Sequence, residues 1–312
     1  MMPAMYAAIS GLQAHQTMLD VTANNLANVD TIGYKAQRTT FVNELSQLLN
    51  GGSGPTGSNA GTNPMQIGLG AEVGSIDNIM GAGSMESTGN TLDVAIQGDG
   101  FLCIGEGSAP APPASEPLVP LPPTAIAATP PIALASLQFT RAGNLTTNSV
   151  GYLTTSNGEY VMGSNVPVTG AATGTLASNT LIYIPPGSTN VSIGADGSVS
   201  YTDNGADANA GQTVVAGYIA LASFPNEAGL ERNGGSTWSA SPNSGAASYG
   251  TPDAGSFATS QTISGELEQS NVDMSTEFTN MIEAERGYQA NSSVISTADT
   301  MMQTLIQMSQ AG

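Results

Sequence analysis

Two stretches of seven-residue spacing, one near each end of the 312-residue chain, constrain its fold more than any other feature. The first stretch consists of Met5, Leu12, Leu19 and Leu26. The second follows strict 3-4-3-4 spacing and consists of Met281, Ala284, Tyr288, Asn291, Ile295, Ala298, Met302 and Leu305. Such spacing predicts helices with a narrow apolar stripe, which suits a partner helix better than a sheet. Because one amphipathic helix cannot bury its stripe alone, we expect the two terminal helices to pair with each other rather than with the middle of the chain.

The expected limits of the two helices follow from start and stop signals. The N-terminal helix should end before Gly33, since glycine is a natural residue just past a helix C-terminus. The C-terminal helix should run from about 274 to 308, close to 50 Å at 1.5 Å per residue. Asp273 or Ser275 is placed to cap its start.

Short apolar runs separated by glycine-containing turns predict that the middle of the chain is all β. The sequence SNG within TTSNGEYV reads as a tight hairpin turn. We therefore predict an α+β fold, in which the N- and C-terminal helices pair as an antiparallel, coiled-coil-like core and the middle forms all-β domains. The expected divisions are 1–32 plus 274–312 as the helical core, 33–75 as a connector and long loop, and 76–273 as β-rich outer domains. A proline-rich insertion at 105–136 should be extended and exposed, as a spacer or as a ligand for a proline-binding partner.

Composition excludes several classes of function. Acidic residues outnumber basic ones 24 to 5, which gives a net charge of −19. The chain therefore has no basic footprint for nucleic acid, and anionic membranes would repel it. No apolar run approaches the ~20 residues that span a bilayer, and the N-terminus is a poor secretory signal. We expect neither nucleic-acid binding nor membrane insertion.

The residues also offer no candidate for catalysis. Cys103 and His15 are the only cysteine and the only histidine, so a disulfide framework and a multi-histidine metal centre are excluded. Cys103 lies in an apolar run and reads as a buried, inert thiol. Asp196, Asp203 and Asp207 lie close in sequence, but the spacing of a calcium loop is missing and turn-forming roles fit them better. We predict no enzyme activity, no cofactor and no metal.

A chain without such chemistry, with apolar seams at both ends, points to a structural subunit. Identical copies that meet through different faces form a helical filament or tube when the contacts do not close into a ring. The seams are interrupted by His15, Gln16 and Thr22 in the first and by Asn291 in the second. We therefore expect the ends to stay mobile in the monomer and to become ordered when a partner arrives.

Three ordered motifs resemble the bacterial flagellar rod and hook proteins. They are SGLQAHQTMLDVTANNLANVDTIGYKAQRTTF near the N-terminus, NPMQIGLGAEVGSIDNIMGAGSMESTGNTLDVAIQGDGFL in the middle, and ISGELEQSNVDMSTEFTNMIEAERGYQANSSVISTADTMMQTLIQM at the C-terminal end. FTRAGNLTTNSVGYL adds a further match. Together the motifs cover roughly the first 104 and the last 50 residues. The proline-rich segment departs from the family pattern, which runs almost directly from DGFL to FTRAGN.

The resemblance implies an axial component of the flagellum that is exported unfolded and stacks into a helical tube, with the terminal helices in the inner layer. The first expectation is a subunit of the extracellular hook, a flexible universal joint that transmits torque between rod and filament. The alternative is the distal rod protein of the basal body, in the cell envelope. A secreted β-rich adhesin is a remote third reading, which leaves the two seams unexplained. The implied partners are further copies of the chain, flagellar rod and hook–filament junction proteins, the export apparatus and the hook cap.

The stretch NNLANVDTIGYKAQRTTF then reads as the junction between a tube-lining helix and its connector. Asn24, Asn25 and Asn28 are expected to hydrogen-bond to neighbouring helices or backbone, where charge would be costly. Beyond the turn at Gly33, Lys35 and Arg38 could meet carboxylates of an adjacent acidic subunit, or they could remain solvated. The predicted subunit-interface residues are these three asparagines together with the apolar residues of both seams.

Overall fold

The computed structural model describes residues 2–54, 60–107, 137–164, 172–173, 180–204 and 211–310. Most of the predicted proline-rich insertion, residues 108–136, lies outside the described residues. The chain divides into two compact units. The helical unit consists of Met1–Val29, Ala36–Ile79 and Val272–Gly312, and the sheet unit consists of Asp30–Lys35 and Met80–Asn271.

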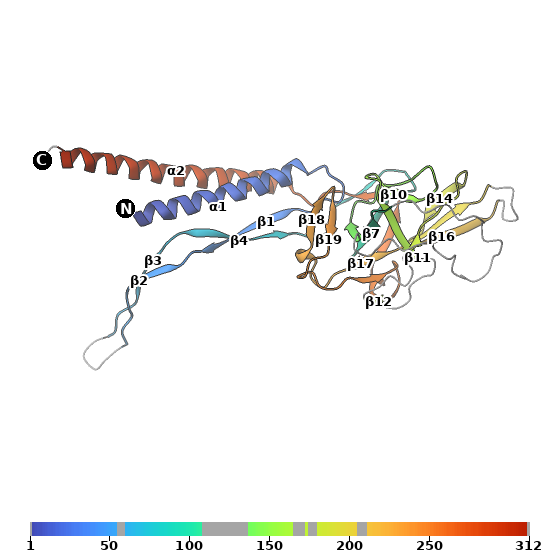
Figure 1. The fold of residues 1–312 in the computed structure, drawn as a ribbon, viewed down its shortest axis with the longest axis horizontal. Helices are drawn as coiled ribbons and strands as arrows, with labels where there is room; N and C mark the ends of the chain where they lie inside the picture. The colour runs from blue at the N-terminus through green and yellow to red at the C-terminus, as the bar shows by residue number, and fades with distance from the viewer. Residues whose placement is uncertain are drawn as a thin grey trace. The chain divides into compact units, whose positions relative to one another are not determined.

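Two long helices form most of the helical unit. Helix α1 spans Met2–Ala27 and helix α2 spans Met274–Gln310. They lie side by side and run in opposite directions, so that both chain termini are at the same end of this unit (Figure 1). With the β-rich middle described below, this confirms the predicted fold class. No helix in the described part of the chain combines the length and the apolar character that crossing a membrane requires.

The ends of these helices follow local hydrogen bonding. At the start of α2, Oδ1 of Asp273 accepts from the backbone N–H of Ser275 (2.9 Å) and Oδ2 accepts from the Thr276 hydroxyl (2.8 Å). These bonds, first the one from Thr276, lower the pKa of Asp273. Helix α1 ends at Ala27, earlier than Gly33 suggested, and a turn follows. There the side chain and the backbone N–H of Asn28 both donate to the backbone oxygen of Asn24 (2.9 and 3.2 Å).

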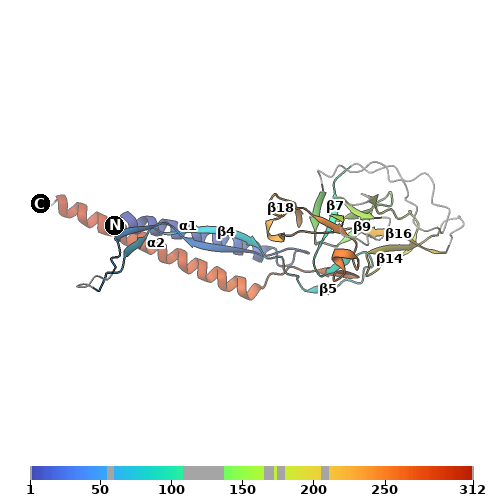
Figure 2. The same cartoon turned by 90° about the horizontal axis from the view of Figure 1, so that it is seen from below.

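A two-stranded ribbon completes the helical unit. Strand β1 (Gln37–Asn43) pairs antiparallel with β4 (Ala71–Asn78), and β2 (Ser46–Asn50) pairs antiparallel with β3 (Met65–Gly68). The β1–β4 part contacts α1, and Figures 1 and 2 show it running along that helix. Strands β2 and β3 continue the ribbon with every residue exposed. Short apolar runs from Met65 onward predicted β structure, which fits β3 and β4, whereas the sequence did not predict β1 and β2.

The sheet unit is built on a 14-stranded sheet among the described residues, with two small sheets beside it. The small sheets pair β5 (Met85–Ser87) with β22 (Glu266–Glu268) and β6 (Val94–Gln97) with β21 (Gln261–Ser264). Short 3-10 turns cover Glu227–Gly229 and Gly255–Phe257. The strands of the large sheet are β7 (Phe101–Gly105), β8 (Leu137–Thr140), β9 (Leu145–Thr147), β10 (Leu153–Thr155), β11 (Tyr160–Ser164), β12 (Ala172–Thr173), β13 (Thr180–Leu181), β14 (Thr189–Ile193), β15 (Ser198–Thr202), β16 (Thr213–Ile219), β17 (Leu221–Ser223), β18 (Glu231–Gly234), β19 (Thr237–Ser239) and β20 (Ser248–Gly250).

Strand β7 lies at the centre of this sheet, paired with β8, β11 and β17. Its side chains alternate between two apolar clusters, because successive residues of a strand point to opposite faces. Leu102 belongs to one cluster, and Phe101 and Cys103 belong to the other. Cys103 is buried as predicted, and burial raises the pKa of its thiol. The predicted SNG turn is also present, since Gly158, with φ of 89°, connects β10 to β11.

Candidate assembly surface

The pairing of α1 with α2 has a constant antiparallel register, fixed by three contacts. Gly11 lies against Asn291, His15 lies against Gly287, and Asn25 donates a hydrogen bond to Glu277. Each step forward along α1, from 11 to 15 and from 15 to 25, is matched by an equal step backward along α2. Continued to Met2, the register leaves residues 301–310 of α2 beyond the described part of α1, and all of them are exposed.

Glycine allows the two helices to approach closely at two of these contacts. A Cβ added to Gly287 would lie 2.5 Å from ring atoms of His15, and one added to Gly11 would lie 2.8 Å from the amide nitrogen of Asn291. Each helix therefore offers a glycine to a polar side chain of the other. His15 and Asn291 are polar interruptions of the apolar seams in the sequence. They nevertheless lie in the helix–helix contact, because the glycines opposite them leave room for their side chains.

Asn25 connects three elements of the helical unit. Its side-chain nitrogen donates to the backbone oxygen of Gln37 at the start of β1 (2.8 Å) and to Oε1 of Glu277 in α2 (3.1 Å). Its side-chain oxygen accepts from the backbone N–H of Gln37 (2.9 Å). The residue is completely buried, so these bonds satisfy polar groups that would otherwise be costly to bury. Of the three predicted amides, Asn25 is the one inside the unit, whereas Asn24 is exposed and Asn28 is half-buried.

The other predicted interface residues follow the register. Ala284 is fully buried, while Tyr288 is 37% exposed. The half-buried ones are Met5, Leu12, Leu19, Leu26, Met281, Asn291, Ile295 and Ala298. Met302 and Leu305 continue the α2 seam beyond α1 and are exposed. The intramolecular pair therefore covers the middle of the seam and leaves its end uncovered.

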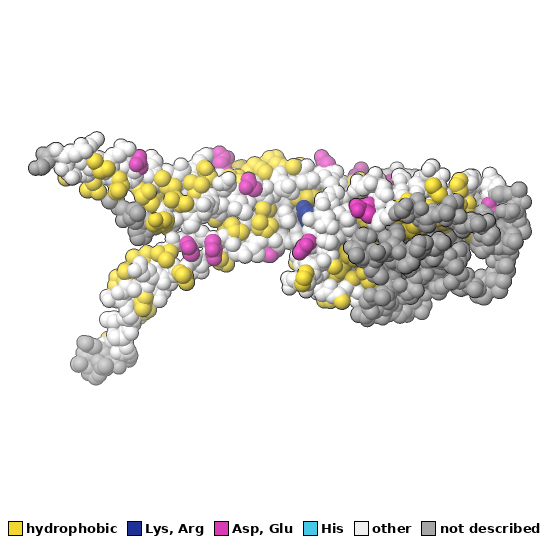
Figure 3. Space-filling model, in the orientation of Figure 1, with side chains coloured by type: hydrophobic (Ala, Val, Ile, Leu, Met, Phe, Trp, Pro, Cys, Tyr) yellow, Lys and Arg dark blue, Asp and Glu magenta, His cyan; other side chains and the backbone are white. Residues whose placement is uncertain are grey.

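The exposed apolar surface of the chain is concentrated on the helical unit. Among the described residues, Val215 is the only strongly exposed large apolar residue that lies in the sheet unit. Figure 3 shows this apolar surface along α2 and along the ribbon. The residues are Tyr6, Ile9, Phe41, Val42, Leu45, Leu48, Leu49, Met65, Ile67, Ile76, Ile79, Met274, Phe278, Ile282, Tyr288, Val294, Met301, Met302, Leu305, Ile306 and Met308. Soluble monomers rarely expose contiguous apolar patches beyond a few hundred Å², so a surface of this kind marks an interaction site.

The β2–β3 part of the ribbon is the least supported element of this surface. Its strands are exposed throughout and carry Leu48, Leu49, Met65 and Ile67. An isolated two-stranded hairpin is marginally stable in water, and unpaired apolar strand edges favour association. The ribbon is therefore expected to gain its stability from contacts with another molecule.

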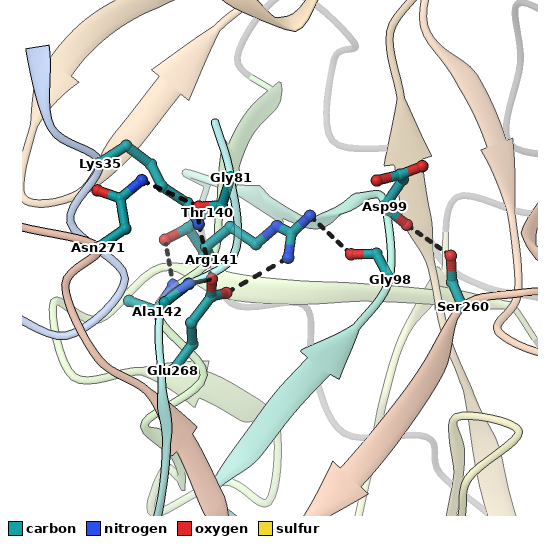
Figure 4. Close-up of polar contacts among 11 residues, drawn as sticks. Lys35, Gly81, Gly98, Asp99, Thr140, Arg141, Ala142, Ser260, Glu268 and Asn271 are labelled. Carbon is teal, nitrogen blue, oxygen red and sulfur yellow. Dashed lines mark hydrogen bonds and ion pairs between the residues drawn. The ribbon is translucent and has the colours of Figure 1, made fainter. Parts of the chain in front are cut away.

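A buried ion cluster lies in the sheet unit, at the segment that leaves α1 (Figure 4). Nζ of Lys35 lies 2.6 Å from Oε1 of Glu268 and donates to the backbone oxygen of Gly81 (3.0 Å). Nη1 of Arg141 lies 3.3 Å from Oε2 of Glu268, and Nη2 donates to Gly98 (2.9 Å). The Lys35 and Glu268 side chains are 0% exposed, and burial, opposed by Glu268, lowers the pKa of Lys35. The expectation that Lys35 meets a neighbouring subunit is therefore wrong, because its carboxylate partner belongs to the same chain.

The turn at Gly33 holds this segment in place. Gly33 adopts φ of 66° and its N–H donates to the backbone oxygen of Glu268 (2.8 Å). A Cβ there would lie 2.7 Å from the backbone of Ala142, so glycine is needed both for its conformation and for close approach. The Arg232 guanidinium lies over the rings of Tyr34 (4.6 Å) and Trp238 (4.8 Å).

Only two of the five basic residues are exposed. Lys35, Arg141 and Arg232 contact partners inside the sheet unit. Arg38 and Arg286 are exposed on the helical unit. Arg38 faces Asp77 across the ribbon at 3.9 Å, with a side chain 66% exposed. Such a pair contributes little to stability.

The described residues contain no group of three or more His, Cys, Asp or Glu side chains arranged to hold a metal ion. Asp196 hydrogen-bonds to Ser198 in a turn (2.6 Å), and Asp207 lies outside the described residues. The site that the geometry does define is an apolar and weakly charged surface on paired terminal helices and a ribbon.

Three family models match the chain, and together they span both terminal helices and part of the sheet unit. A model of the flagella basal body rod protein matches residues 5–35, and one of the flagellar basal body rod FlgEFG protein C-terminal region matches 263–308. The model of the flagellar hook protein FlgE/F/G D1 domain matches 134–201. All three belong to one class of axial, structural proteins.

Full-length relatives give the family directly. The flagellar basal-body rod protein FlgG of Bacillus subtilis is 38% identical over 99% of both chains. FlgG of Agrobacterium fabrum is 33% identical over 96% of this chain and 97% of its own length. The flagellar hook protein FlgE of Borreliella burgdorferi is 48% identical over 34% of this chain and 24% of its own length. The chain belongs to the flagellar basal-body rod and hook protein family, and it is a structural protein of the bacterial flagellum rather than an enzyme.

Proposed function

We propose that the chain is a subunit of the distal rod of the flagellar basal body. The observation that carries this proposal is the extent of the matches: rod proteins named FlgG match over nearly the whole of both chains, whereas hook proteins match over about a third of this one. The hook, which was the first expectation from the sequence, is supported by a higher identity, but only within that third. Because the chain belongs to the flagellar rod and hook family, we no longer consider a secreted adhesin.

The helical unit supplies the surface through which copies would assemble. Burying a half-exposed apolar side chain contributes about 1 kcal/mol, and association costs roughly 4–15 kcal/mol in lost freedom. One small contact would therefore be weak, and stable assembly requires that each copy bury several parts of the surface at once. A helical polymer meets this requirement, because every subunit has several neighbours.

The two units would have different roles in such a polymer. The helical unit, with its exposed apolar residues and uncovered α2 end, would form the continuous core of the tube. The sheet unit has two buried apolar clusters of its own and, among its described residues, Val215 as its one strongly exposed large apolar residue. It can therefore remain solvated, and we place it on the outside of the rod.

Genetic complementation separates rod from hook. The chain would be expressed in one flagellated strain that lacks its distal rod protein and in another that lacks its hook protein. The proposal predicts that complete rods form in the first strain and that no hooks form in the second. Restoration of hooks, with no effect on rods, would contradict it.

Assembly through the helices has its own test. Purified full-length protein would be compared with chains that lack residues 1–30 or 275–312, using electron microscopy of the polymer. We expect tubes from the full chain alone. Tubes from either truncated chain would rule out a role for the helix pair in assembly.

A further inference from the structure

Arg286 lies on the side of α2 that faces away from α1. Ala284, which is fully buried, marks the side that faces α1. At about 100° per residue, a position two residues further along the helix lies about 200° around it. Arg286 is accordingly exposed, and its Nη1 donates to Oε1 of Gln289, one turn along on the same helix (3.2 Å).

The same face of α2 carries exposed apolar side chains. Phe278 and Ile282 precede Arg286 at spacings of eight and four residues, which places the three on one ridge of the helix. Phe278 is 50% and Ile282 is 58% exposed. We call Phe278, Ile282 and Arg286 the outer ridge of α2. The outer ridge combines apolar surface with one cation. It takes no part in the pairing of α2 with α1.

The charge distribution makes this cation unusual. Three of the five basic residues are occupied inside the sheet unit, and Arg38 faces Asp77 on the ribbon. Arg286 is the one basic residue that, in the part of the chain the structure describes, makes neither an ion pair nor a contact with an aromatic ring. The chain as a whole carries 24 acidic residues against these five.

We propose that the outer ridge of α2 docks onto a second copy of the chain and that Arg286 binds a carboxylate of that copy. This inference rests on the proposed polymer. Charge complementarity identifies the occupant: every copy has an excess of carboxylates, and the outer ridge holds the cation available to pair with one. The guanidinium is suited to this contact because it binds a carboxylate through two parallel N–H groups.

The docking would also set which arrangement of copies is allowed. Packed copies with a net charge of −19 repel each other unless cations lie between them. A single cation on an otherwise apolar ridge favours the one orientation in which it meets a carboxylate, and orientations that bring two carboxylates together are disfavoured. Arg286 would thus act in the specificity of assembly as well as in its strength.

The test compares the protein concentration at which full-length variants begin to sediment as polymer, with electron microscopy of the pellet. The variants are Arg286→Glu, Arg286→Lys and, as a control with the same change in net charge on the exposed surface of the sheet unit, the double variant Asn190→Asp/Gln212→Glu. We expect Arg286→Glu to raise this concentration about tenfold or more and the control to change it by less than about threefold. Arg286→Lys should raise it less than Arg286→Glu, because lysine keeps the charge and loses the two-N–H contact. Because Arg286 is exposed, thermal unfolding of the unassembled protein should be unchanged in all three.

The possible outcomes are distinct. Equal shifts for Arg286→Glu and for the sheet-unit control would show that only net charge matters, and would overturn the inference. Assembly of Arg286→Glu at the wild-type concentration would also overturn it, and would assign the outer ridge to a different partner or to solvent. If the wild-type chain forms no polymer under any condition, the proposed function itself fails, and this inference fails with it.

Discussion

The imidazole of His15 lies directly against the backbone of Gly287, so that a polar ring of α1 fits into the gap left by a missing side chain on α2. The same arrangement occurs in the opposite sense four residues away, where Asn291 of α2 lies against Gly11 of α1. These contacts explain how two imperfect apolar seams form a helix pair with a single register.

Substitution of Gly287 by alanine tests this contact. In an exposed helix position the change would stabilise the helix by about 1 kcal/mol. Here the new methyl group would meet the His15 ring at 2.5 Å, and such overpacking costs about 1–3 kcal/mol. We therefore expect Gly287→Ala to destabilise α1–α2 pairing in the wild-type chain and to stabilise it when His15 is also alanine. Helical circular dichroism during thermal unfolding of the four variants measures this. A stabilising effect in both backgrounds would show that the ring is not in contact.

Asn25 should be far more sensitive than its neighbour Asn24. Asn25→Ala removes bonds to Gln37 and Glu277 in a buried environment and leaves their polar groups unsatisfied, at a cost of about 1–3 kcal/mol. Asn24→Ala at an exposed position should change the free energy of unfolding by less than about 0.5 kcal/mol. Urea unfolding gives both values, and hydrogen exchange at the Gln37 amide reports the local effect. Equal values for the two variants would contradict the role assigned to Asn25.

Sequence reasoning succeeded where spacing alone determines the structure. The predicted α2, from about 274 to 308, begins at the same residue as the observed helix and ends two residues before it. Spacing could also have set Asn24 apart from the other two amides. Asn25 follows the buried residue Val21 by four positions and Ala14 by eleven, which places all three on one side of α1. Asn28 follows Val21 by seven positions and lies on that side too, so spacing sets only Asn24 apart.

Contacts between segments far apart in the sequence could not be predicted. Lys35 and Glu268 are separated by 233 positions, and nothing in the spacing around either residue indicates that they meet. Strands β1 and β2 were missed for a different reason. They are followed by a glycine- and serine-rich loop, and β2 is exposed throughout, with no alternation that would reveal a buried face.

The buried ion cluster should depend strongly on Glu268. Glu268→Gln leaves both Lys35 and Arg141 buried without a carboxylate, which costs about 3–5 kcal/mol. Arg38→Gln removes an exposed pair of 3.9 Å and should cost less than about 0.5 kcal/mol. Denaturant unfolding followed by Trp238 fluorescence reports on the sheet unit. A loss below 1 kcal/mol for Glu268→Gln would mean that the cluster is solvated.

Alkaline pH should weaken the sheet unit through Tyr249. Burial raises the pKa of this phenol to about 12, whereas an unfolded tyrosine titrates near 10. Between these values the unfolded chain releases a proton that the folded chain keeps, so stability falls as pH rises. Tyr249→Phe should remove part of that fall between pH 10 and 12, as measured by urea unfolding across the range. An unchanged pH dependence in the variant would show that Tyr249 does not titrate late.

The central claim is that copies of this chain form the distal rod, with the helical unit buried between neighbours. Electron cryomicroscopy of basal bodies isolated from a strain whose rod contains this chain tests it most directly. We predict density for the chain in the distal rod, with the exposed apolar residues of α2 and the ribbon covered by adjacent copies. Density for the chain in the hook instead, or a rod in which α2 and the ribbon face solvent, would contradict the claim.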